Sequence, residues 1–228
     1  PHRCSSGRPP RTTDAAFGRR LGRGVIGYQT CADLSMRRLL AYFWFTLVMC
    51  TTAVLSDVKV ILRFRGWILR PCFRSCGKRF EIASGARINF TNRMSIGDDV
   101  YIGPGCWINA YGGVTLDDQV MLGPYTILVT TEHARVNGSY RFGHAESLPV
   151  QIGRGSWTAA HVVVVKGVRV GRGVLVASGA VVTRDLPDNC VAGGVPARVL
   201  RVMEPAPADV APHLTNPDCG AGSSCPLP

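Results

Sequence analysis

Aliphatic residues recur every six positions along the middle of the chain, and this spacing governs what the sequence predicts. The recurrence continues after a long interruption, with Thr158 in the one slot that lacks an aliphatic side chain. An amphipathic helix would give a spacing of about 3.6 and a half-buried strand a spacing of about 2, so neither element fits. The positions are Ile82 and Ile88; Ile96, Ile102 and Ile108; Leu116, Leu122 and Leu128; and Ile152, Val164, Val170, Val176 and Val182.

Small residues accompany this pattern and indicate what each repeat does. A small or β-branched residue follows four positions after the aliphatic one, as at Ala86, and Gly, Ala or Asp often follows it directly, as at Gly97. Each hexad therefore predicts a short strand with its large residue inward and a turn closed by a small residue. One hexad cannot bury its own face, so the repeats must stack into an all-β solenoid over residues 81–202.

Two breaks interrupt the repeat. The spacing between Ile108 and Leu116 is eight, and a longer polar segment, 130–149, separates Leu128 from Ile152. Insertions in a repeat protein form surface loops and often carry function. We therefore expect the chemistry of this protein in the inserted loop 130–149.

An apolar run, Leu39–Leu55, precedes the repeats and continues into a stretch where apolar and basic residues mix. The run is shorter than the roughly 20 residues of a membrane span. We expect residues 36–80 to be helical and to lie on a membrane surface, while a true span and a helix packed only on the protein remain open. The basic residues after the run predict that the repeats lie in the cytoplasm, with peripheral attachment to the inner face of the cytoplasmic membrane.

Charge is distributed unevenly over the 228 residues. The chain has 26 Lys and Arg against 15 Asp and Glu, but residues 1–80 hold 15 of the basic and 3 of the acidic side chains, which leaves 11 and 12 for the rest. Basic residues that flank an apolar run favour an anionic membrane over nucleic acid as a partner.

The two ends of the chain and the cysteines add little chemistry. Residues 1–35 show no apolar periodicity, so we expect them to be disordered or to lie upstream of a true start at Met36. The Pro-rich tail 203–228 is likewise expected to be disordered. The nine cysteines lack zinc-site spacing and are interpreted as free thiols.

Beyond the repeat itself, several short motifs make the sequence resemble a known family, the hexapeptide-repeat acyltransferases, over about half of the chain. The nearest type is the sugar and polysaccharide O-acetyltransferases. The resemblance implies a left-handed parallel β-helix and a homotrimer with active sites between subunits. The motifs are Thr-Thr-Glu-His at 130–133, Pro-Val-Gln-Ile-Gly at 149–153, Ser-Trp at 156–157, Val-Thr-Arg-Asp-Leu-Pro at 182–187 and Ala-Gly-Gly-Val-Pro-Ala-Arg-Val at 192–199.

The resemblance also implies site residues and a co-substrate, acetyl-CoA, with no metal. His133 matches the general base, and a neutral imidazole can take a proton from a hydroxyl that attacks a thioester. Asn109 matches an acceptor-side position, and His144, in the same loop as His133, is a second candidate for contact with the acceptor. Six residues match cofactor-lining positions: Trp157, Ala160, Ser178, Thr183, Arg184 and Arg198.

The function that these residues favour is transfer of acetyl from acetyl-CoA to a hydroxyl of a sugar or glycan precursor, of exopolysaccharide or lipopolysaccharide type. Two alternatives come from other classes. A non-catalytic hexapeptide-repeat scaffold would need no cofactor groove, and a γ-type zinc carbonic anhydrase would need three converging histidines. The close His-x-x-x-x-His pair expected for such an anhydrase is absent from the sequence.

Overall fold

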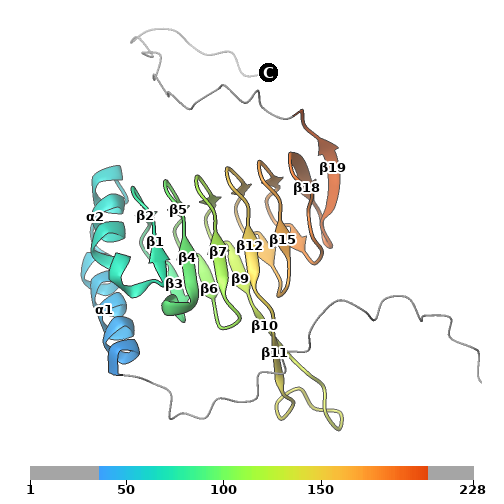
Figure 1. Cartoon of the computed structure of the whole chain (residues 1–228), viewed down its shortest axis with the longest axis horizontal. Coiled ribbons are helices and arrows are strands. Elements are labelled where there is room, and N and C mark those ends of the chain that lie inside the picture. The colour runs from blue at the N-terminus through green and yellow to red at the C-terminus, as the bar shows by residue number, and fades with distance from the viewer. Residues whose placement is uncertain (1–35, 205–228) are drawn as a thin grey trace, which may run out of the picture.

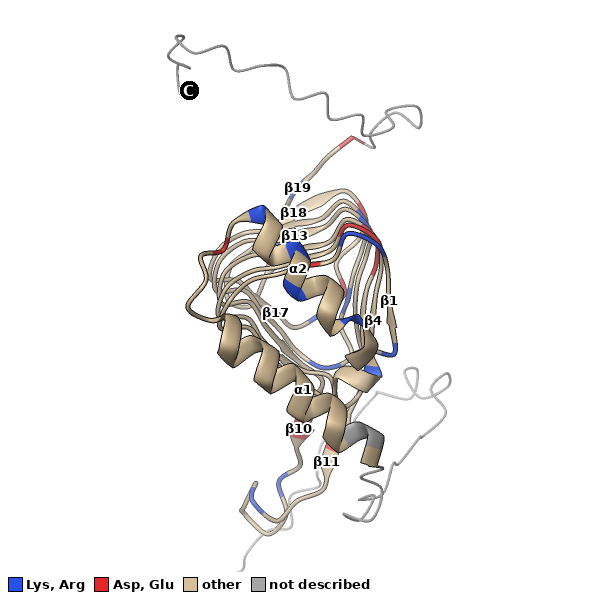
Figure 2. Ribbon diagram, turned by 90° about the vertical axis from the view of Figure 1, so that its left-hand side faces the viewer, with Lys and Arg blue, Asp and Glu red and all other residues tan. Residues whose placement is uncertain are grey.

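The computed structural model describes residues 36–204, and within this range the chain forms a parallel β-helix closed at one end by two α-helices (Figure 1). The predictions for residues 1–35 and for residues 205–228 of the tail lie outside the described residues. Seen along its axis, the β-helix is a triangular coil with three faces, and the two helices lie across its open end (Figure 2).

Each face is one sheet of stacked short strands, named here sheets A, B and C. Sheet A contains β1 (Ser75–Cys76), β4 (Met94–Ile96), β7 (Val114–Leu116), β12 (Val150–Ile152) and β15 (Arg169–Val170). Sheet B contains β2 (Glu81–Ile82), β5 (Tyr101–Ile102), β8 (Met121–Leu122), β13 (Trp157–Thr158), β16 (Leu175–Val176), β18 (Cys190–Gly193) and the antiparallel β19 (Arg198–Val202). Sheet C contains β3 (Arg87–Asn89), β6 (Trp107–Asn109), β9 (Ile127–Val129), β14 (Val163–Val164) and β17 (Val181–Val182).

The six-residue repeat produces the core as the sequence predicts. Each aliphatic position points inward and pairs in register with its equivalent one coil away, as Ile102 does with Leu122, and both side chains are fully buried. Thr158 takes its slot between Leu122 and Val176. Its hydroxyl is buried and lies 3.0 Å from the Thr126 hydroxyl, so the two side chains satisfy each other inside the apolar ladder.

The breaks in the repeat share one place in the fold, the corner that joins sheet C to sheet A. The eight-residue interval from Ile108 to Leu116 falls there, and so does an equal interval from Ile88 to Ile96, which contains the 3₁₀ turn η3 (Thr91–Arg93). The inserted loop 130–149 leaves the coil at the same corner. Because the extra residues collect at one corner, the other turns stay short and the three ladders stay in register.

The helices α1 (Met36–Thr52) and α2 (Lys59–Leu69) cover the first coil. A second 3₁₀ turn, η2 (Arg70–Cys72), leads from α2 into β1. Gly66 allows the close approach of α2, since a Cβ there would lie 1.9 Å from the carbonyl oxygen of Phe80. Phe73 packs edge-on against both Phe45 of α1 and Phe80, with ring centroids 6.3 and 5.5 Å apart. The cap is therefore joined to the solenoid core by an aromatic cluster.

A fully buried arginine fastens the connection between the helices. Arg65 donates from Nε to the Thr52 hydroxyl and from its terminal nitrogens to the Thr52 and Leu55 carbonyls and to the carboxylate of Asp57. The Asp57 carboxylate also accepts hydrogen bonds from the backbone N–H and the hydroxyl of Ser84. The guanidinium thus satisfies the carbonyls at the C-terminal end of α1, while Asp57 ties the loop to the solenoid.

Within the described residues 36–204, no helix is both long enough and apolar enough to cross a bilayer.

Candidate active site

A two-stranded hairpin carries the predicted general base. The inserted loop forms β10 (Thr131–His133) and β11 (Ala145–Ser147), which pair antiparallel with His133 opposite Ala145. Figure 1 shows the hairpin extending away from the solenoid at the sheet C to sheet A corner. Backbone hydrogen bonds from Leu148 N to Thr130 O, at 3.0 Å, and from Thr130 N to Asn109 O, at 3.3 Å, join its base to the coil.

Lys166 lies between two carboxylates at the base of this hairpin. Glu132 and Glu146 are directly opposite each other on β10 and β11, an arrangement that is destabilising for like charges. The Lys166 ammonium donates to both, at 2.9 and 2.8 Å. Its hydrogen bond to Glu146 raises the pKa of Lys166 and lowers the pKa of Glu146. Lys166 therefore holds both hairpin strands against the solenoid from one point.

The His133 imidazole is exposed and lines a pocket within the hairpin itself. The other lining residues are Tyr140, Arg141 and Phe142, which lie in the connection between the two strands. Phe142 is 80% exposed and Tyr140 61% exposed, so large apolar surface surrounds an accessible base. This arrangement can present an imidazole to a hydroxyl-bearing ligand, with aromatic rings available to pack against it.

The structure places Asn109 at the base of the hairpin. Its Nδ2 donates to the Thr131 hydroxyl at 3.1 Å, and its Oδ1 accepts from the backbone N–H of Tyr111 at 3.2 Å. Asn109 is therefore engaged in holding the corner and the start of β10. His144 is exposed, and its carbonyl accepts a hydrogen bond from Ala134 N, next to His133.

Four of the six predicted cofactor residues divide between two corners of the triangular coil. Trp157 projects outward from sheet B and is 44% exposed, and Ala160 and Ser178 follow at the sheet B to sheet C corner in successive coils. Thr183 and Arg184 lie instead at the sheet C to sheet A corner, together with the hairpin and His133. Arg198 begins β19 at the end of the solenoid. One chain brings Asn109 and the His133 hairpin together but does not bring Trp157, Ala160 and Ser178 to them.

Two features of this region were not predicted as such from the sequence. Phe90, Arg93 and Tyr111 form a cluster at the hairpin corner, with the two rings edge-on and the Arg93 guanidinium 4.7 Å from the Tyr111 ring centroid. Tyr125 and His161 stack on each other at the sheet B to sheet C corner. Both clusters join residues from successive coils. The sequence could have predicted them only if the register of the repeat had been used to align the corner positions of neighbouring coils.

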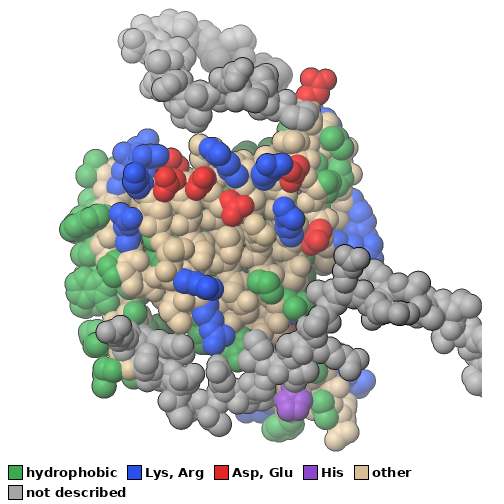
Figure 3. Space-filling model, in the orientation of Figure 1, with side chains coloured by type: hydrophobic (Ala, Val, Ile, Leu, Met, Phe, Trp, Pro, Cys, Tyr) green, Lys and Arg blue, Asp and Glu red, His purple; other side chains and the backbone are tan. Residues whose placement is uncertain are grey.

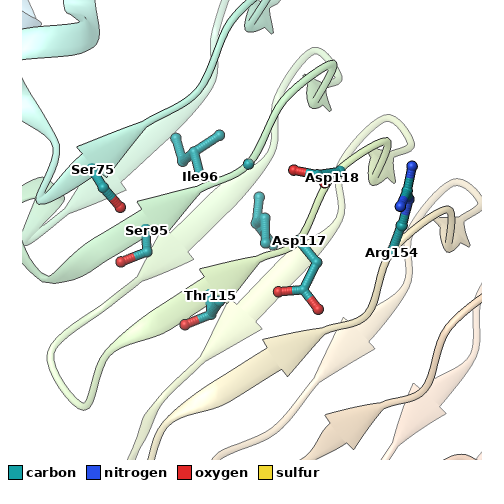
Figure 4. A pocket seen from close by; sticks show the side chains of 9 residues that line it. Ser75, Ser95, Ile96, Thr115, Asp117, Asp118 and Arg154 are labelled. Carbon is teal, nitrogen blue, oxygen red and sulfur yellow. The ribbon is translucent and has the colours of Figure 1, made fainter.

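A separate hollow lies on sheet A, away from every predicted site residue. Figure 4 shows Ser75, Ser95 and Thr115 as a row of hydroxyls beside Asp117, Asp118 and Arg154. The Asp118 carboxylate already accepts a hydrogen bond from the backbone N–H of Asp98 at 2.8 Å, which joins two successive coils. No group of three or more His, Cys, Asp or Glu side chains that could hold a metal ion occurs within residues 36–204.

Known proteins resemble this chain in sequence. Residues 149–184 match the family described as bacterial transferase hexapeptide (six repeats). Galactoside O-acetyltransferase of Escherichia coli K12 is 33% identical over 135 residues, which are 59% of this chain and 60% of that protein. YJL218W of Saccharomyces cerevisiae, provisionally assigned as an acetyltransferase, is 30% identical over 59% of this chain and 68% of its own length.

A solved structure extends the likeness to the fold. Galactoside acetyltransferase in complex with coenzyme A superposes with a TM-score of 0.65 and 26% identity, over 75% of this chain and 85% of that one. The predicted fold class, a left-handed parallel β-helix of hexapeptide repeats preceded by a helical segment, is confirmed. The alignment with the Escherichia coli protein spans less than two thirds of that protein's length.

Proposed function

The chain belongs to the hexapeptide-repeat acetyltransferases, and on that premise we propose that it transfers an acetyl group from acetyl-CoA to a hydroxyl of a sugar or glycan precursor. The observation that carries the proposal is the placement of His133, an accessible imidazole that lines a pocket on a hairpin fixed to the solenoid by Lys166. The likeness to a galactoside O-acetyltransferase supports a sugar hydroxyl as acceptor. The proposal extends this acceptor to a glycan precursor of exopolysaccharide or lipopolysaccharide type.

In this reaction His133 acts as the general base. The imidazole takes the proton of the acceptor hydroxyl as its oxygen attacks the thioester carbonyl, and an oxygen–carbon bond forms. The tetrahedral intermediate then collapses, the carbon–sulfur bond breaks and coenzyme A leaves as the thiolate. Backbone N–H groups and polar side chains at the edge of the solenoid stabilise the oxyanion. Lys166 is a positioning residue here, because it holds β10 and with it His133.

We propose that the complete site forms between subunits of a homotrimer. The division of predicted site residues between two corners of one chain supports this, because a second copy is needed to bring the two groups together. The outward faces of sheets B and C support it as well, since they carry apolar rows available for burial, whereas sheet A presents Ser75, Ser95 and Thr115. The rows are Tyr101, Met121, Trp157, Leu175 and Val191 on sheet B and Trp107, Ile127, Val163 and Val181 on sheet C.

The helical cap supports a further proposal, peripheral attachment to the inner face of the cytoplasmic membrane. Its outer surface exposes large apolar side chains on both helices, among them Phe43 and Trp67, each 67% exposed, and Val60, 75% exposed. Figure 3 shows such side chains gathered with basic ones at the helical end of the molecule. Aromatic and basic residues mixed in this way suit the interfacial region of an anionic bilayer.

The charge of the cap favours a lipid surface, and not the cap of a second copy of the chain, as the partner that covers these apolar side chains. Lys59, Arg63, Arg70 and Arg74 are exposed on α2 or just after it, while Asp57 is the only acid between Met36 and Phe80. Two caps placed face to face would bring these cations together, whereas anionic headgroups would neutralise them.

The catalytic proposal is tested by release of coenzyme A thiol during an acceptor screen with acetyl-CoA. With an active acceptor found, His133→Ala should lower kcat by about 10²–10⁴-fold. Arg135→Ala, on the same hairpin, is the matched control and should keep full activity. Full activity of a folded His133→Ala protein would overturn the role of His133, whereas a wild-type chain that binds no coenzyme A would overturn the proposed reaction.

The membrane proposal is tested by cosedimentation of the full chain with lipid vesicles. We expect binding to vesicles that contain phosphatidylglycerol and little binding to phosphatidylcholine alone. Phe43→Glu with Trp67→Glu should abolish the binding, while Val202→Glu, at a site 70% exposed on the opposite end, should leave it intact. Equal recovery with and without vesicles would refute attachment.

A further inference from the structure

The far end of the inserted hairpin is a defined turn. Val136 and Ser139 exchange two backbone hydrogen bonds, of 2.9 and 3.0 Å, around Asn137 and Gly138, which both have positive φ. Asn-Gly with this backbone is a preferred two-residue turn of β-hairpins. The residues that follow, 140–142, therefore leave the turn in a fixed direction, back toward β10.

Close backbone contact holds this segment beside the proposed base. A Cβ at the buried Gly143 would lie 1.7 Å from the carbonyl oxygen of Ala134, so glycine is needed for the approach. The backbone N–H of Ala134 also donates to the carbonyl of His144 at 3.0 Å. Because Ala134 directly follows His133, these contacts keep segment 140–142 next to the imidazole.

The pocket that results combines three kinds of side chain. Its volume of about 560 Å³ is within the range of about 300–1,000 Å³ that small-molecule sites have. The imidazole of His133, the rings of Tyr140 and Phe142, and the cationic side chain of Arg141 line it. Arg141 is held there through its backbone N–H, which donates to the Ser139 hydroxyl at 3.2 Å.

The charge of Arg141 has no counter-charge within the hairpin. Segment 130–149 contains two acids, Glu132 and Glu146, and both are paired with Lys166. No carboxylate among residues 36–204 forms an ion pair with Arg141. A guanidinium presents a planar fork of N–H donors that suits the oxygens of a carboxylate or a phosphate. The pocket therefore offers a binding group for an anion beside the base.

We propose that the acceptor is an anionic sugar, whose charged group is bound by Arg141 while His133 takes the proton of a neighbouring hydroxyl. The inference rests on the proposed function and deepens it, because it names a substrate class. The charged group is an oxyanion, either a carboxylate on the sugar ring or a phosphate ester. The apolar face of the ring would pack against Tyr140 or Phe142. Arg141 thus determines specificity, since a neutral sugar gives the guanidinium no charged partner.

Three probes built on one sugar ring test this proposal: D-galactose, D-galacturonate and D-galactose 1-phosphate. Their affinity for the full chain is measured by ligand-observed NMR titration, with and without coenzyme A. Arg141→Gln removes the charge and keeps a long polar side chain, while Arg141→Lys keeps the charge without the fork. Arg135→Gln is the matched control, because it removes the same charge from the same hairpin at a residue that does not line the pocket.

We expect at least one anionic probe to bind about tenfold or more tightly than D-galactose, and the preferred probe identifies carboxylate or phosphate as the source of the oxyanion. Arg141→Gln should reduce this preference to about twofold or less, and Arg141→Lys should restore part of it. Arg135→Gln should keep the wild-type preference. The affinity for D-galactose should change by less than about threefold in all three variants.

Three results would overturn the inference. The first is a wild-type chain that does not prefer an anionic probe, whether it binds all three alike or none. The second is an equal loss of preference in Arg141→Gln and Arg135→Gln, which would reflect only the overall charge of the hairpin. The third is unchanged probe binding in Arg141→Gln with weaker coenzyme A binding or a changed oligomeric mass, which would assign Arg141 to the donor or to a subunit contact.

Failure of the proposed function gives a different result. A wild-type chain that binds no coenzyme A would overturn the acetyl transfer, while its preference for an anionic probe without coenzyme A would still report on Arg141. Conversely, coenzyme A binding and thiol release with a neutral sugar alone would keep the proposed function and exclude the anionic acceptor.

Discussion

The buried hydroxyl pair in the solenoid core allows a quantitative test of how the ladder is stabilised. Thr126 and Thr158 are fully buried, and their hydroxyls lie 3.0 Å apart. Thr126 Oγ1 has a second, longer contact of 3.4 Å with the Ala159 carbonyl, while the Thr158 hydroxyl has no further partner among the described residues. Replacing one threonine by valine, which has nearly the same shape, therefore affects the two sites differently.

Thr126→Val leaves the Thr158 hydroxyl buried and unpaired, which should cost about 1–3 kcal/mol of unfolding free energy. Thr158→Val should cost about 1 kcal/mol or less, because Thr126 can still donate to Ala159 O. The double variant removes both hydroxyls and places a methyl group between Leu122 and Val176, so its stability should be close to that of the wild type or higher.

The assay is urea unfolding followed by circular dichroism, with the four proteins compared as a double-mutant cycle. The expected coupling free energy is at least about 1 kcal/mol in the direction that relieves the single-variant losses. If the double variant were destabilised by the sum of the two single losses, the hydroxyl pair would not be the reason that threonine is accepted in this slot.

Three further predictions concern the hairpin, the cap and the thiols. Lys166→Met leaves Glu132 directly opposite Glu146 with no cation between them, so β10 and with it His133 lose their fixed position. The kcat should therefore fall by about tenfold or more while the solenoid stays folded, as measured by acetyl-CoA turnover. Burial raises the pKa of Asp57, but hydrogen bonds from Arg65 and Ser84 outweigh this effect and the pKa is lowered. The contribution of Asp57 to the stability of the cap is therefore complete above the unfolded pKa of about 3.9 and is lost as the pH falls through the lower folded value. Acid unfolding monitored by tryptophan fluorescence detects this loss. Burial raises the pKa of Cys106 to about 11, so this thiol should resist a disulfide reagent at pH 8 until the protein unfolds, while the exposed Cys50 reacts at once.

The sequence by itself determined the solenoid. A six-residue period is a local property: each hexad must turn the chain by one face of the triangle and bury one aliphatic side chain, so the ladder from Ile82 to Val182 could be written down before any contact was known. The inserted loop was visible in the same way, because 130–149 lacks the period, and its motif pointed to His133.

Only the tertiary structure decided how that loop is held and which residues meet across coils. Lys166 is far from Glu132 and Glu146 in sequence, and its two ion pairs depend on where the corner of the next coil places it. The same holds for the stack of Tyr125 on His161 and for the buried Arg65. Such contacts join positions whose separation is set by the lengths of loops and coils, so local pattern cannot reveal them.

The arrangement of the predicted site residues was also settled by the coil rather than by the motifs. Trp157 and Thr183 both belong to short motifs of the family resemblance, yet they lie at different positions around the triangle. The physical reason is that the hexad a residue belongs to decides its face or corner of the triangle, while its phase within the hexad decides whether its side chain points inward or outward.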